Sequence, residues 1–486
     1  MKLQDCEITL EDSIVFSELS GDRNPIHLDP LAARRLIYGK PVVHGVHLSL
    51  KLLEHLLTGG RDVPSPRRIR ARFNAPLFHD TSAVASVAHT KPNKSRMSLH
   101  AGVQELGWVE VEAPVTGGPR ASDIPKLRAD EETHPVLLAG GDIASHAGSV
   151  DLSLDRDTYA KLFPALAALH GWDGIVSILL ASTYIVGMLC PGMNSLLASF
   201  DLSAPEGNTQ VYGNDALNYR VKRHDPRFNS VVIEVQTGPW TGTINAFVRP
   251  APAVQPSYGE VCDEISARQW QDRHALVVGG SRGLGEVAAK IVCAAGGRCT
   301  LTYQKGADDA QRVRDEIIDG GGSAETLQLD VEGDIASQLG TAPAHAVTDI
   351  LYFPSPHISP SLSGDFDQVL FDKYMRVYVY PLAPLLAVLT ERSTGSPRIF
   401  WPSSAYIDKP VRGFAEYAAA KGAGEAICRW LVLDYPDAEI RVPRLPPMRT
   451  DQTLSIVPVK IAEPLDVLCG ELLADPEKRS HAQPNT

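Results

Sequence analysis

Residues 277–285 read Val-Val-Gly-Gly-Ser-Arg-Gly-Leu-Gly and decide the fold of the C-terminal part of this chain. The run completes an apolar segment, residues 274–278, and opens an alanine-rich segment predicted to be helical over 286–295. Further short apolar runs recur downstream with helix-like segments between them: 299–303, 350–353 and 398–401. This alternation predicts an α/β Rossmann fold, a doubly wound parallel sheet with helices on both faces.

The glycine-rich turn predicts a dinucleotide site. A pyrophosphate binds against a helix N-terminus, where side chains would block its close approach. The expected cofactor-binding residues of this turn are Gly279, Ser281, Gly283, Leu284 and Gly285.

Two basic residues indicate which dinucleotide is bound. At the end of the next predicted strand, where an acidic residue would bind the ribose 2′-hydroxyl of NAD, the chain has Lys305. Arg282 lies within the glycine turn itself. Two cations match a 2′-phosphate, so we expect NADPH in preference to NADH.

Three polar residues downstream form a candidate catalytic set. Tyr417 and Lys421 lie four residues apart on a predicted helix and therefore face the same side. A tyrosine with an ordinary pKa of about 10 is too weak an acid to protonate a ketone during hydride transfer, unless a cation lowers that pKa. Lys421 would supply the cation, and Ser404, thirteen residues before Tyr417, would hold the substrate oxygen.

The N-terminal part has a different cluster. Residues 16–27 read Phe-Ser-Glu-Leu-Ser-Gly-Asp-Arg-Asn-Pro-Ile-His, so that Asp22 and His27 share one short loop. Adding or removing water at a double bond next to a carbonyl requires groups that move protons and a donor that stabilises the enolate oxygen. Asp22 and His27 would move the protons. The donor would be the N–H of Gly45, which follows His44 close to a predicted helix start.

At 486 residues the chain is too long for a single hydrophobic core. Segments rich in polar and turn-forming residues divide it: residues 117–123 and 130–132 predict a solvated connection, and the proline-rich residues 250–256 predict an extended spacer. We expect domains at 1–116, 148–250 and 272–455, followed by a C-terminal helix and tail at 456–486.

The first two domains repeat one plan. In the first, a helical run over 48–57 precedes alternating segments at 69–73 and 97–103, and similar segments recur in the second at 217–221 and 231–235. The second domain has Pro191-Gly192 at the expected place of His44-Gly45, and it has no Asp-x-x-x-x-His pair. We therefore predict a duplicated α+β helix-wrapped sheet in which only the first half has a dyad.

Composition narrows the partners and the compartment. A net charge of -12 disfavours binding to nucleic acid or to an anionic membrane surface. Seven scattered cysteines without a C-x-x-C pair predict reduced thiols, no metal site and a cytoplasmic protein. No signal peptide is evident at the start. The apolar stretch 175–190 is interrupted by polar residues, so we predict a buried helix and no membrane span.

The string over residues 16–27, followed by His44-Gly45, closely resembles the motif of MaoC-like hydratases, (R)-specific enoyl-thioester hydratases and dehydratases with hot-dog folds. The resemblance is strong over residues 16–45 and diffuse over the rest of the first domain. It implies that Asp22 and His27 form the catalytic dyad, that Asn24 supports the loop and that Gly45 contributes to the oxyanion site. The second domain then resembles the degenerate half of a double hot-dog.

Residues from about 272 to 455 resemble the short-chain dehydrogenase/reductase family, in particular its β-ketoacyl-thioester reductases. The resemblance implies that Ser404, Tyr417 and Lys421 form the catalytic triad. It also implies that Asp330-Val331 lies near the adenine.

The C-terminal part also matches this family at one further position and departs from it at two places. Thr450, in Pro-Pro-Met-Arg-Thr, sits where the family's loop closes over the nicotinamide. Phe-Pro-Ser-Pro at residues 353–356 replaces the family's Asn-Asn-Ala-Gly, and Tyr378 takes the place of a catalytic asparagine.

The two resemblances describe consecutive steps on one substrate. Together they imply a bifunctional enzyme that reduces a 3-ketoacyl thioester of coenzyme A or acyl carrier protein and then dehydrates the (R)-3-hydroxyacyl product, in fatty-acid or polyketide biosynthesis. A common chain raises the local concentration of the intermediate. Two alternatives stay open: a hydratase or dehydratase whose reductase-like domain is a cofactor-binding or docking module, and the reverse, β-oxidation direction. We also expect a homo-oligomer, because both families commonly self-associate.

Overall fold

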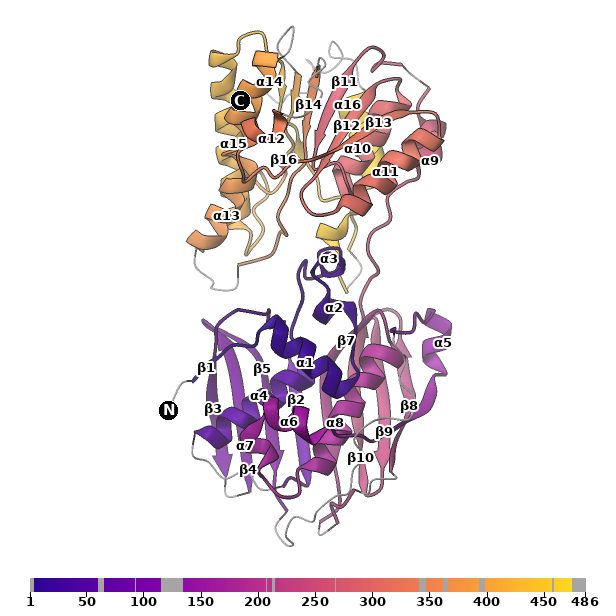
Figure 1. The fold of residues 1–486 in the computed structure, drawn as a ribbon, viewed down its shortest axis with the longest axis vertical. Helices are drawn as coiled ribbons and strands as arrows, with labels where there is room; N and C mark the ends of the chain where they lie inside the picture. Colours follow the sequence, from indigo (N-terminus) through magenta and orange to yellow (C-terminus); the bar gives the residue numbers. More distant parts are fainter. Residues whose placement is uncertain are drawn as a thin grey trace. The chain divides into compact units, whose positions relative to one another are not determined.

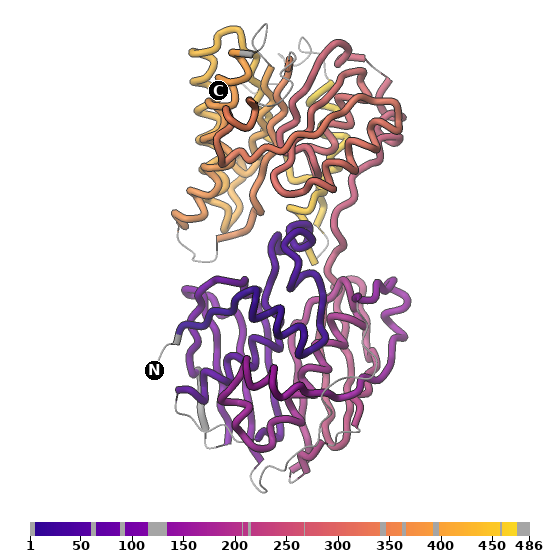
Figure 2. Tube along the Cα trace, viewed as in Figure 1, coloured from indigo at the N-terminus to yellow at the C-terminus, as the bar shows by residue number. Residues whose placement is uncertain are grey.

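The computed structural model describes residues 4–59, 65–91, 93–114, 134–206, 208–211, 215–266, 268–340, 347–361, 366–392, 398–456 and 459–473. The predicted solvated connection at 117–123 and 130–132 lies outside the described residues. The chain forms two compact units, Met1–Ala251 with Ser455–Pro458 and Pro252–Leu454 with Val459–Thr486. Figure 2 traces the path of the chain through each of them.

The first unit is built on one ten-stranded antiparallel sheet. Its strands are β1 (Gln4–Cys6), β2 (Arg68–Phe73), β3 (Ala83–Lys91), β4 (Lys94–Ala101), β5 (Gln104–Glu112), β6 (Ala147–Asp151), β7 (Ser195–Ser203), β8 (Ala216–Asp225), β9 (Ser230–Thr237) and β10 (Trp240–Val248). Their order across the sheet is β1-β3-β4-β5-β2-β7-β10-β9-β8-β6. The second five strands mirror the first five, and the halves join where β2 pairs with β7. The predicted double hot-dog is confirmed.

Helices cover one face of this sheet (Figure 1). The described helices of this unit are α1 (Leu10–Ser20), α2 (Pro25–Leu28), α3 (Pro30–Ala33), α4 (Gly45–Thr58), α5 (Gly140–Ala144), α6 (Arg156–Leu162), α7 (Pro164–Ala167) and α8 (Asp173–Tyr184), which continues into a π-helical turn, η1 (Ile185–Leu189). Every residue of α8 is buried. The apolar stretch at 175–190 is therefore the predicted buried helix. Within the described ranges, no helix is both long and apolar enough to cross a membrane.

One predicted correspondence between the halves is wrong. His44-Gly45 lies at the start of the central helix α4, whereas Pro191-Gly192 lies after the central helix α8 and before β7. The sheet order equates α4 with α8, so Pro191-Gly192 corresponds to the chain between α4 and β2. The error arose because proline and glycine mark a turn at either end of a helix.

The second unit has a six-stranded parallel sheet in the order β13-β12-β11-β14-β15-β17. Its strands are β11 (His274–Val278), β12 (Arg298–Tyr303), β13 (Ser323–Gln328), β14 (Asp349–Tyr352), β15 (Arg398–Phe400) and β17 (Ile440–Arg441), beside a small pair, β16 (Ser403–Ser404) and β18 (Arg444–Leu445). The predicted strands at 274–278, 299–303, 350–353 and 398–401 are β11, β12, β14 and β15. The edge strand β13 was not predicted, because its sequence, Ser-Ala-Glu-Thr-Leu-Gln, is largely polar.

Helices pack against both faces of this parallel sheet, as predicted. Along β11, Ala275 and Val277 belong to one apolar core, while Leu276 and Val278 belong to another on the opposite face. The helices are α9 (Tyr258–Glu264), α10 (Gly283–Ala294), α11 (Ala307–Asp319), α12 (Ile335–Leu339), α13 (Gln368–Tyr378), α14 (Leu382–Arg392), α15 (Ala415–Asp434), the 3-10 turn η2 (Asp451–Thr453) and α16 (Pro464–Leu472). The fold is the predicted Rossmann fold.

Candidate active sites

A sharp turn between α1 and α2 brings Asp22 and His27 together. Gly21 ends α1 in the left-handed conformation (φ 74°), which favours glycine. The Asn24 side chain then caps α2 by accepting a hydrogen bond from the N–H of Ile26 (3.2 Å). Asp22, only 1% exposed, lies within this turn, and His27 lies on α2.

His27 is set up to accept a proton. Its Nδ1 lies 2.7 Å from the carbonyl oxygen of Val42, and because a carbonyl can only accept, Nδ1 bears the ring hydrogen. The lone pair is then on Nε2. Burial lowers the pKa of His27, and the negative charge of Asp22 opposes this shift, so the ring is neutral at neutral pH and an imidazolium beside Asp22 would be stabilised.

His44 joins this pair, although the sequence had indicated it only as the neighbour of Gly45. Its ring stacks on that of His27, with 3.8 Å between the centroids, and its Nε2 donates to the backbone carbonyl of Asp22 (3.1 Å). One carboxylate oxygen of Asp22 and one ring nitrogen each of His27 and His44 all lie within 4.8 Å of one another. Burial lowers the pKa of His44 well below its ordinary value, so this ring positions its neighbours as a neutral group.

Gly45 is the first residue of α4, as predicted. Its N–H belongs to the first helical turn, where no carbonyl four residues earlier lies within the helix to accept it. A Cβ here would approach Cε2 of Phe73 to 2.7 Å, so this close packing favours glycine. The site thus has two titratable side chains close together and a backbone donor at a helix start.

The second repeat holds the carboxylate of the first. Thr183, on α8, donates its hydroxyl to Oδ2 of Asp22 (2.7 Å). A Cβ on Gly187, in η1, would lie 2.1 Å from Oδ1 of Asp22, so only glycine fits there. The Asn24 amide donates to the carbonyls of Gly187 (2.9 Å) and Gly192 (3.1 Å). Neither Thr183 nor Gly187 was predicted from the sequence.

The glycine turn of the second unit is shaped to receive a pyrophosphate. Gly279 (φ 75°) and Gly283 (φ 58°) adopt left-handed conformations. A Cβ on Gly285 would lie 2.2 Å from the carbonyl oxygen of Gly279, while a Cβ on Gly283 would meet nothing closer than Thr450 at 3.8 Å. Gly283 opens α10, so backbone N–H groups at a helix start face this space. These residues fit a dinucleotide.

The other predicted cofactor residues differ in their surroundings: some are buried, some are paired and one is exposed. Arg282 forms an ion pair with Asp451 (Nη1–Oδ2, 3.0 Å), and Lys305 is exposed just after β12. Buried Thr450 caps the 3-10 turn that contains Asp451. Asp330 accepts a hydrogen bond from the N–H of Glu332. The remaining predicted positions are Ser281, which is buried, and Leu284 and Val331, which pack against the two cores.

Ser404, Tyr417 and Lys421 come together as the sequence predicts. Tyr417 and Lys421 share one side of α15, and Ser404 ends β16. Burial raises the pKa of Tyr417, and a hydrogen bond from Ser404 opposes this shift. Burial lowers the pKa of Lys421 to about 7.

Aromatic rings surround the lysine. The Lys421 Nζ donates to the carbonyl of Pro402 (2.8 Å) and lies 3.9 Å from the ring centroid of Tyr378 and 4.6 Å from that of Trp401. The Tyr378 hydroxyl lies 2.7 Å from Oγ of Ser355. The two departures from the family pattern, at residues 353–356 and at Tyr378, are therefore in contact, and Tyr378 touches the lysine through its ring.

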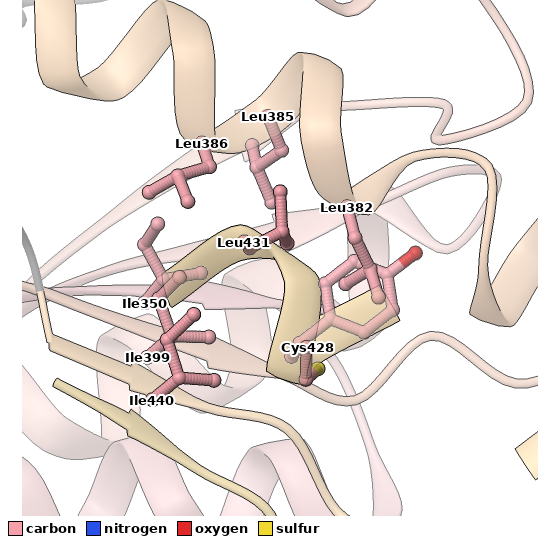
Figure 3. A pocket seen from close by; sticks show the side chains of 9 residues that line it. Ile350, Leu382, Leu385, Leu386, Ile399, Cys428, Leu431 and Ile440 are labelled. Carbon is pink, nitrogen blue, oxygen red and sulfur yellow. The ribbon is translucent and has the colours of Figure 1, made fainter. Parts of the chain in front are cut away.

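A separate apolar pocket lies in the core of the second unit (Figure 3). It is lined by Ile350, Tyr352, Leu382, Leu385, Leu386, Ile399, Cys428, Leu431 and Ile440. The hydroxyl of Tyr352 donates to the carbonyl of Val377. None of the three predicted catalytic residues lines it, so it is distinct from the cluster of Ser404, Tyr417 and Lys421.

These two sites correspond to two families. Residues 273–456 match the model of the short chain dehydrogenase family, and the chain belongs to that family. Residues 2–108 match the model described as MaoC like domain. A probable tetrahydroxynaphthalene reductase of Zymoseptoria tritici is 30% identical over 219 residues, which are 43% of this chain and 78% of that protein.

A 3-hydroxyacyl-thioester dehydratase Y of Mycobacterium tuberculosis is 34% identical over 92 residues, 18% of this chain and 31% of that protein. The chain thus spans less than a third of that dehydratase. Among solved structures, a short chain dehydrogenase of Burkholderia cenocepacia in complex with NADP is 23% identical, covering 44% of this chain and 94% of that chain with a TM-score of 0.39.

Proposed function

We propose that this chain is a bifunctional enzyme: its second unit reduces a 3-ketoacyl thioester, and its first unit dehydrates the (R)-3-hydroxyacyl thioester formed. The observation that supports this best is the presence, in one chain, of a close Asp22–His27 pair, whose carboxylate is buried, and an assembled Ser404, Tyr417 and Lys421. The dehydratase relative is named for 3-hydroxyacyl thioesters, the product class of a ketoacyl reductase. The substrates proposed are thioesters of coenzyme A or acyl carrier protein, in a biosynthetic role.

In the first unit, the proposed chemistry is removal of water. His27 takes the proton from the carbon next to the carbonyl through Nε2, and the nearby charge of Asp22 stabilises the imidazolium. The carbon–carbon double bond forms, the carbon–oxygen bond breaks, and the same proton leaves with the hydroxyl as water. The Gly45 N–H donates to the thioester oxygen while it bears the enolate charge.

In the second unit, the proposed chemistry is reduction of a ketone. NADPH, when bound, supplies a hydride. Ser404 holds the ketone oxygen, Tyr417 donates a proton to it, and the Lys421 ammonium favours the tyrosinate that results. The positive charges of Arg282 and Lys305 favour NADPH, with the 2′-phosphate replacing Asp451 as the partner of Arg282.

Self-association of the chain and its predicted domain boundaries stay predictions.

The test follows acetoacetyl-coenzyme A with NADPH, measuring cofactor oxidation and identifying products by mass spectrometry. Wild type should yield the enoyl thioester. Asp22→Asn or His27→Ala should stop at the 3-hydroxyacyl thioester, and Tyr417→Phe should abolish cofactor oxidation. Unchanged dehydration in both dyad variants would refute the dyad.

A second candidate function is favoured by one observation. Tyr378 fills the place of the family's asparagine beside Lys421. If this change disables reduction, the second unit is a cofactor-binding or docking module and only dehydration remains. Tight NADPH binding by calorimetry without turnover of any 3-ketoacyl thioester would establish this function in place of the first.

A further inference from the structure

Arg249 is a buried cation that forms no ion pair with any acidic residue in the part of the chain that the structure describes. It follows β10 and is only 2% exposed. Its Nη2 donates to the carbonyl of Met193. Among the residues that the structure describes, none accepts a hydrogen bond from its Nε or Nη1. Buried charges are normally paired and hydrogen-bonded, so these orphaned donors point to a missing anionic partner.

The guanidinium stays charged at neutral pH. Burial lowers the pKa of Arg249 to about 10, and it is the only influence on that pKa that the structure registers. A partly buried arginine of the second unit shows the contrast: Arg273 forms an ion pair with Asp349, which is 2% exposed. Among the described residues, no carboxylate pairs with Arg249 in this way.

Arg249 lies beside the dyad without touching it. The Met193 carbonyl that accepts from Arg249 also accepts from the side-chain amide of Asn24 (3.3 Å). Asn24 belongs to the same turn as Asp22. The charge of Arg249 also reaches His27, whose pKa it lowers. A substrate group bound by Arg249 would therefore lie close to the turn that bears the dyad.

We propose that Arg249 binds a carboxylate on the acyl chain of the thioester processed by the first unit, so that this unit prefers acidic acyl groups. The proposal rests on the dehydratase function proposed above. A carboxylate suits the site better than an enolate oxygen, because a carboxylate offsets the buried charge from the moment of binding, whereas the enolate exists only transiently. The planar guanidinium with several free N–H donors matches the geometry of a carboxylate.

The experiment measures binding of saturated coenzyme A thioesters, which cannot be hydrated. Matched pairs differ only in ending with a carboxylate or a methyl group: succinyl and butyryl, glutaryl and pentanoyl, adipyl and hexanoyl. Calorimetry on the full chain compares wild type, Arg249→Gln, Arg249→Lys and, as a matched loss of charge on the same unit, Arg223→Gln, because Arg223 is exposed on β8. Hydration of crotonyl-coenzyme A is measured alongside.

In wild type, the acidic member of at least one pair should bind about tenfold more tightly or better, the gain expected for a charged hydrogen bond. Arg249→Gln should remove this preference, Arg249→Lys should keep part of it, and Arg223→Gln should leave it unchanged. Equal binding within every pair by wild type, or a preference that survives Arg249→Gln, would overturn the proposal. If Arg249→Gln does not fold, the difference in wild-type binding between the acidic and the methyl-ended thioesters still tests the proposal.

The two proposals fail separately. A carboxylate preference without hydration of crotonyl-coenzyme A would leave the Arg249 site standing and remove the dehydratase function. Hydration without any carboxylate preference would keep the function and reject the site.

Discussion

Thr183 and Asp22 lie 161 residues apart in the sequence, yet the hydroxyl of one donates to the carboxylate of the other. A carboxylate that is 1% exposed needs such partners, because burial of a charge without them is costly. The hydrogen bond also fixes which way the carboxylate points. Thr183 is therefore a positioning residue for the proposed dyad.

Thr183→Val should slow dehydration by about tenfold to a hundredfold, since a hydrogen bond to a charged group contributes about 1.5–3 kcal/mol. Reduction of the ketone should be unchanged, because it belongs to the other unit. Product analysis of acetoacetyl-coenzyme A turnover measures both steps, and Thr183→Ser, which keeps the hydroxyl, should behave as wild type. Equal rates for Thr183→Val and wild type would contradict the positioning role.

The pKa of Lys421 governs the pH dependence of the proposed reduction. Its ordinary value is 10.5, and burial lowers it to about 7. Below that pH the lysine is a cation that favours proton donation by Tyr417, and above it the charge is lost. We expect kcat/KM for ketone reduction to fall as the pH rises through about 7.

The rings around the lysine allow a check on this pH profile. Tyr378→Leu removes a cation–π contact that stabilises the Lys421 ammonium. The fall in kcat/KM for ketone reduction should therefore begin at a lower pH. Tyr378→Phe keeps the ring and should leave the decline in place. The measurement is the initial rate of NADPH oxidation over a pH series, and a rate that is flat up to pH about 9 would refute the assignment.

At the scale of elements, the π-helical turn η1 lies against the dyad turn of the other repeat. Single π-helical turns within α-helices occur frequently at functional sites. Here η1 extends α8 and brings Gly187 against Asp22, with its carbonyl accepting from Asn24. The second repeat, which has no dyad of its own, thus forms one wall of the first repeat's site.

Gly187→Ala should abolish dehydration, because its Cβ would lie 2.1 Å from Oδ1 of Asp22 and would displace that carboxylate. Unfolding followed by circular dichroism should also show a loss of about 1–3 kcal/mol, typical of overpacking. Gly141→Ala is the matched control, since Gly141 is in helix α5 of the same unit and a Cβ there meets nothing within 4 Å. Full dehydration by Gly187→Ala would show that Asp22 tolerates displacement.

At the scale of the whole molecule, several histidines couple the first unit to pH. Burial lowers the pKa of His47 to about 3 and that of His79 to about 4, and it also lowers the pKa of His44 well below its ordinary value of 6.5. At pH values between the ordinary histidine pKa of 6.5 and these lowered folded-state pKa values, the unfolded chain binds protons that the folded chain does not. Stability is therefore fully present above pH 6.5 and is lost as the pH falls toward the folded-state values.

We expect the free energy of unfolding of the first unit to fall by up to about 1.4 kcal/mol per pH unit for each such histidine. Hydrogen exchange of peptides from α4, measured from neutral pH down to pH about 4, gives this free energy of unfolding at each pH. His47→Phe should flatten the dependence while keeping the stacking on Phe16, which lies 4.6 Å from the His47 ring. An unchanged slope in this variant would exclude His47 as a contributor.

Local patterns predicted the Rossmann fold and most of the strands of the parallel sheet, whereas the hot-dog fold was inferred from the resemblance to MaoC-like hydratases. The run 274–285 has an apolar strand, a glycine turn and a helix in consecutive residues, so short-range preferences specify it. The same holds for Asp22 and His27, which are joined by a capping asparagine and a proline and directly follow the glycine that ends α1. The polar edge strand β13 lacked such a pattern, and the proline–glycine pair at 191–192 was assigned to the wrong end of a helix.

The sequence alone predicted the Rossmann fold, the double hot-dog through its MaoC-like motif, and the short segments that bear the proposed dyad and triad, because each of these motifs lies within a few residues. Only the tertiary structure decided that Thr183, Gly187 and Arg249 lie around the dyad turn and that the Tyr378 ring lies beside Lys421. Contacts between segments so far apart depend on how the two halves of the sheet and their helices pack, and a single sequence has no local signal for that packing.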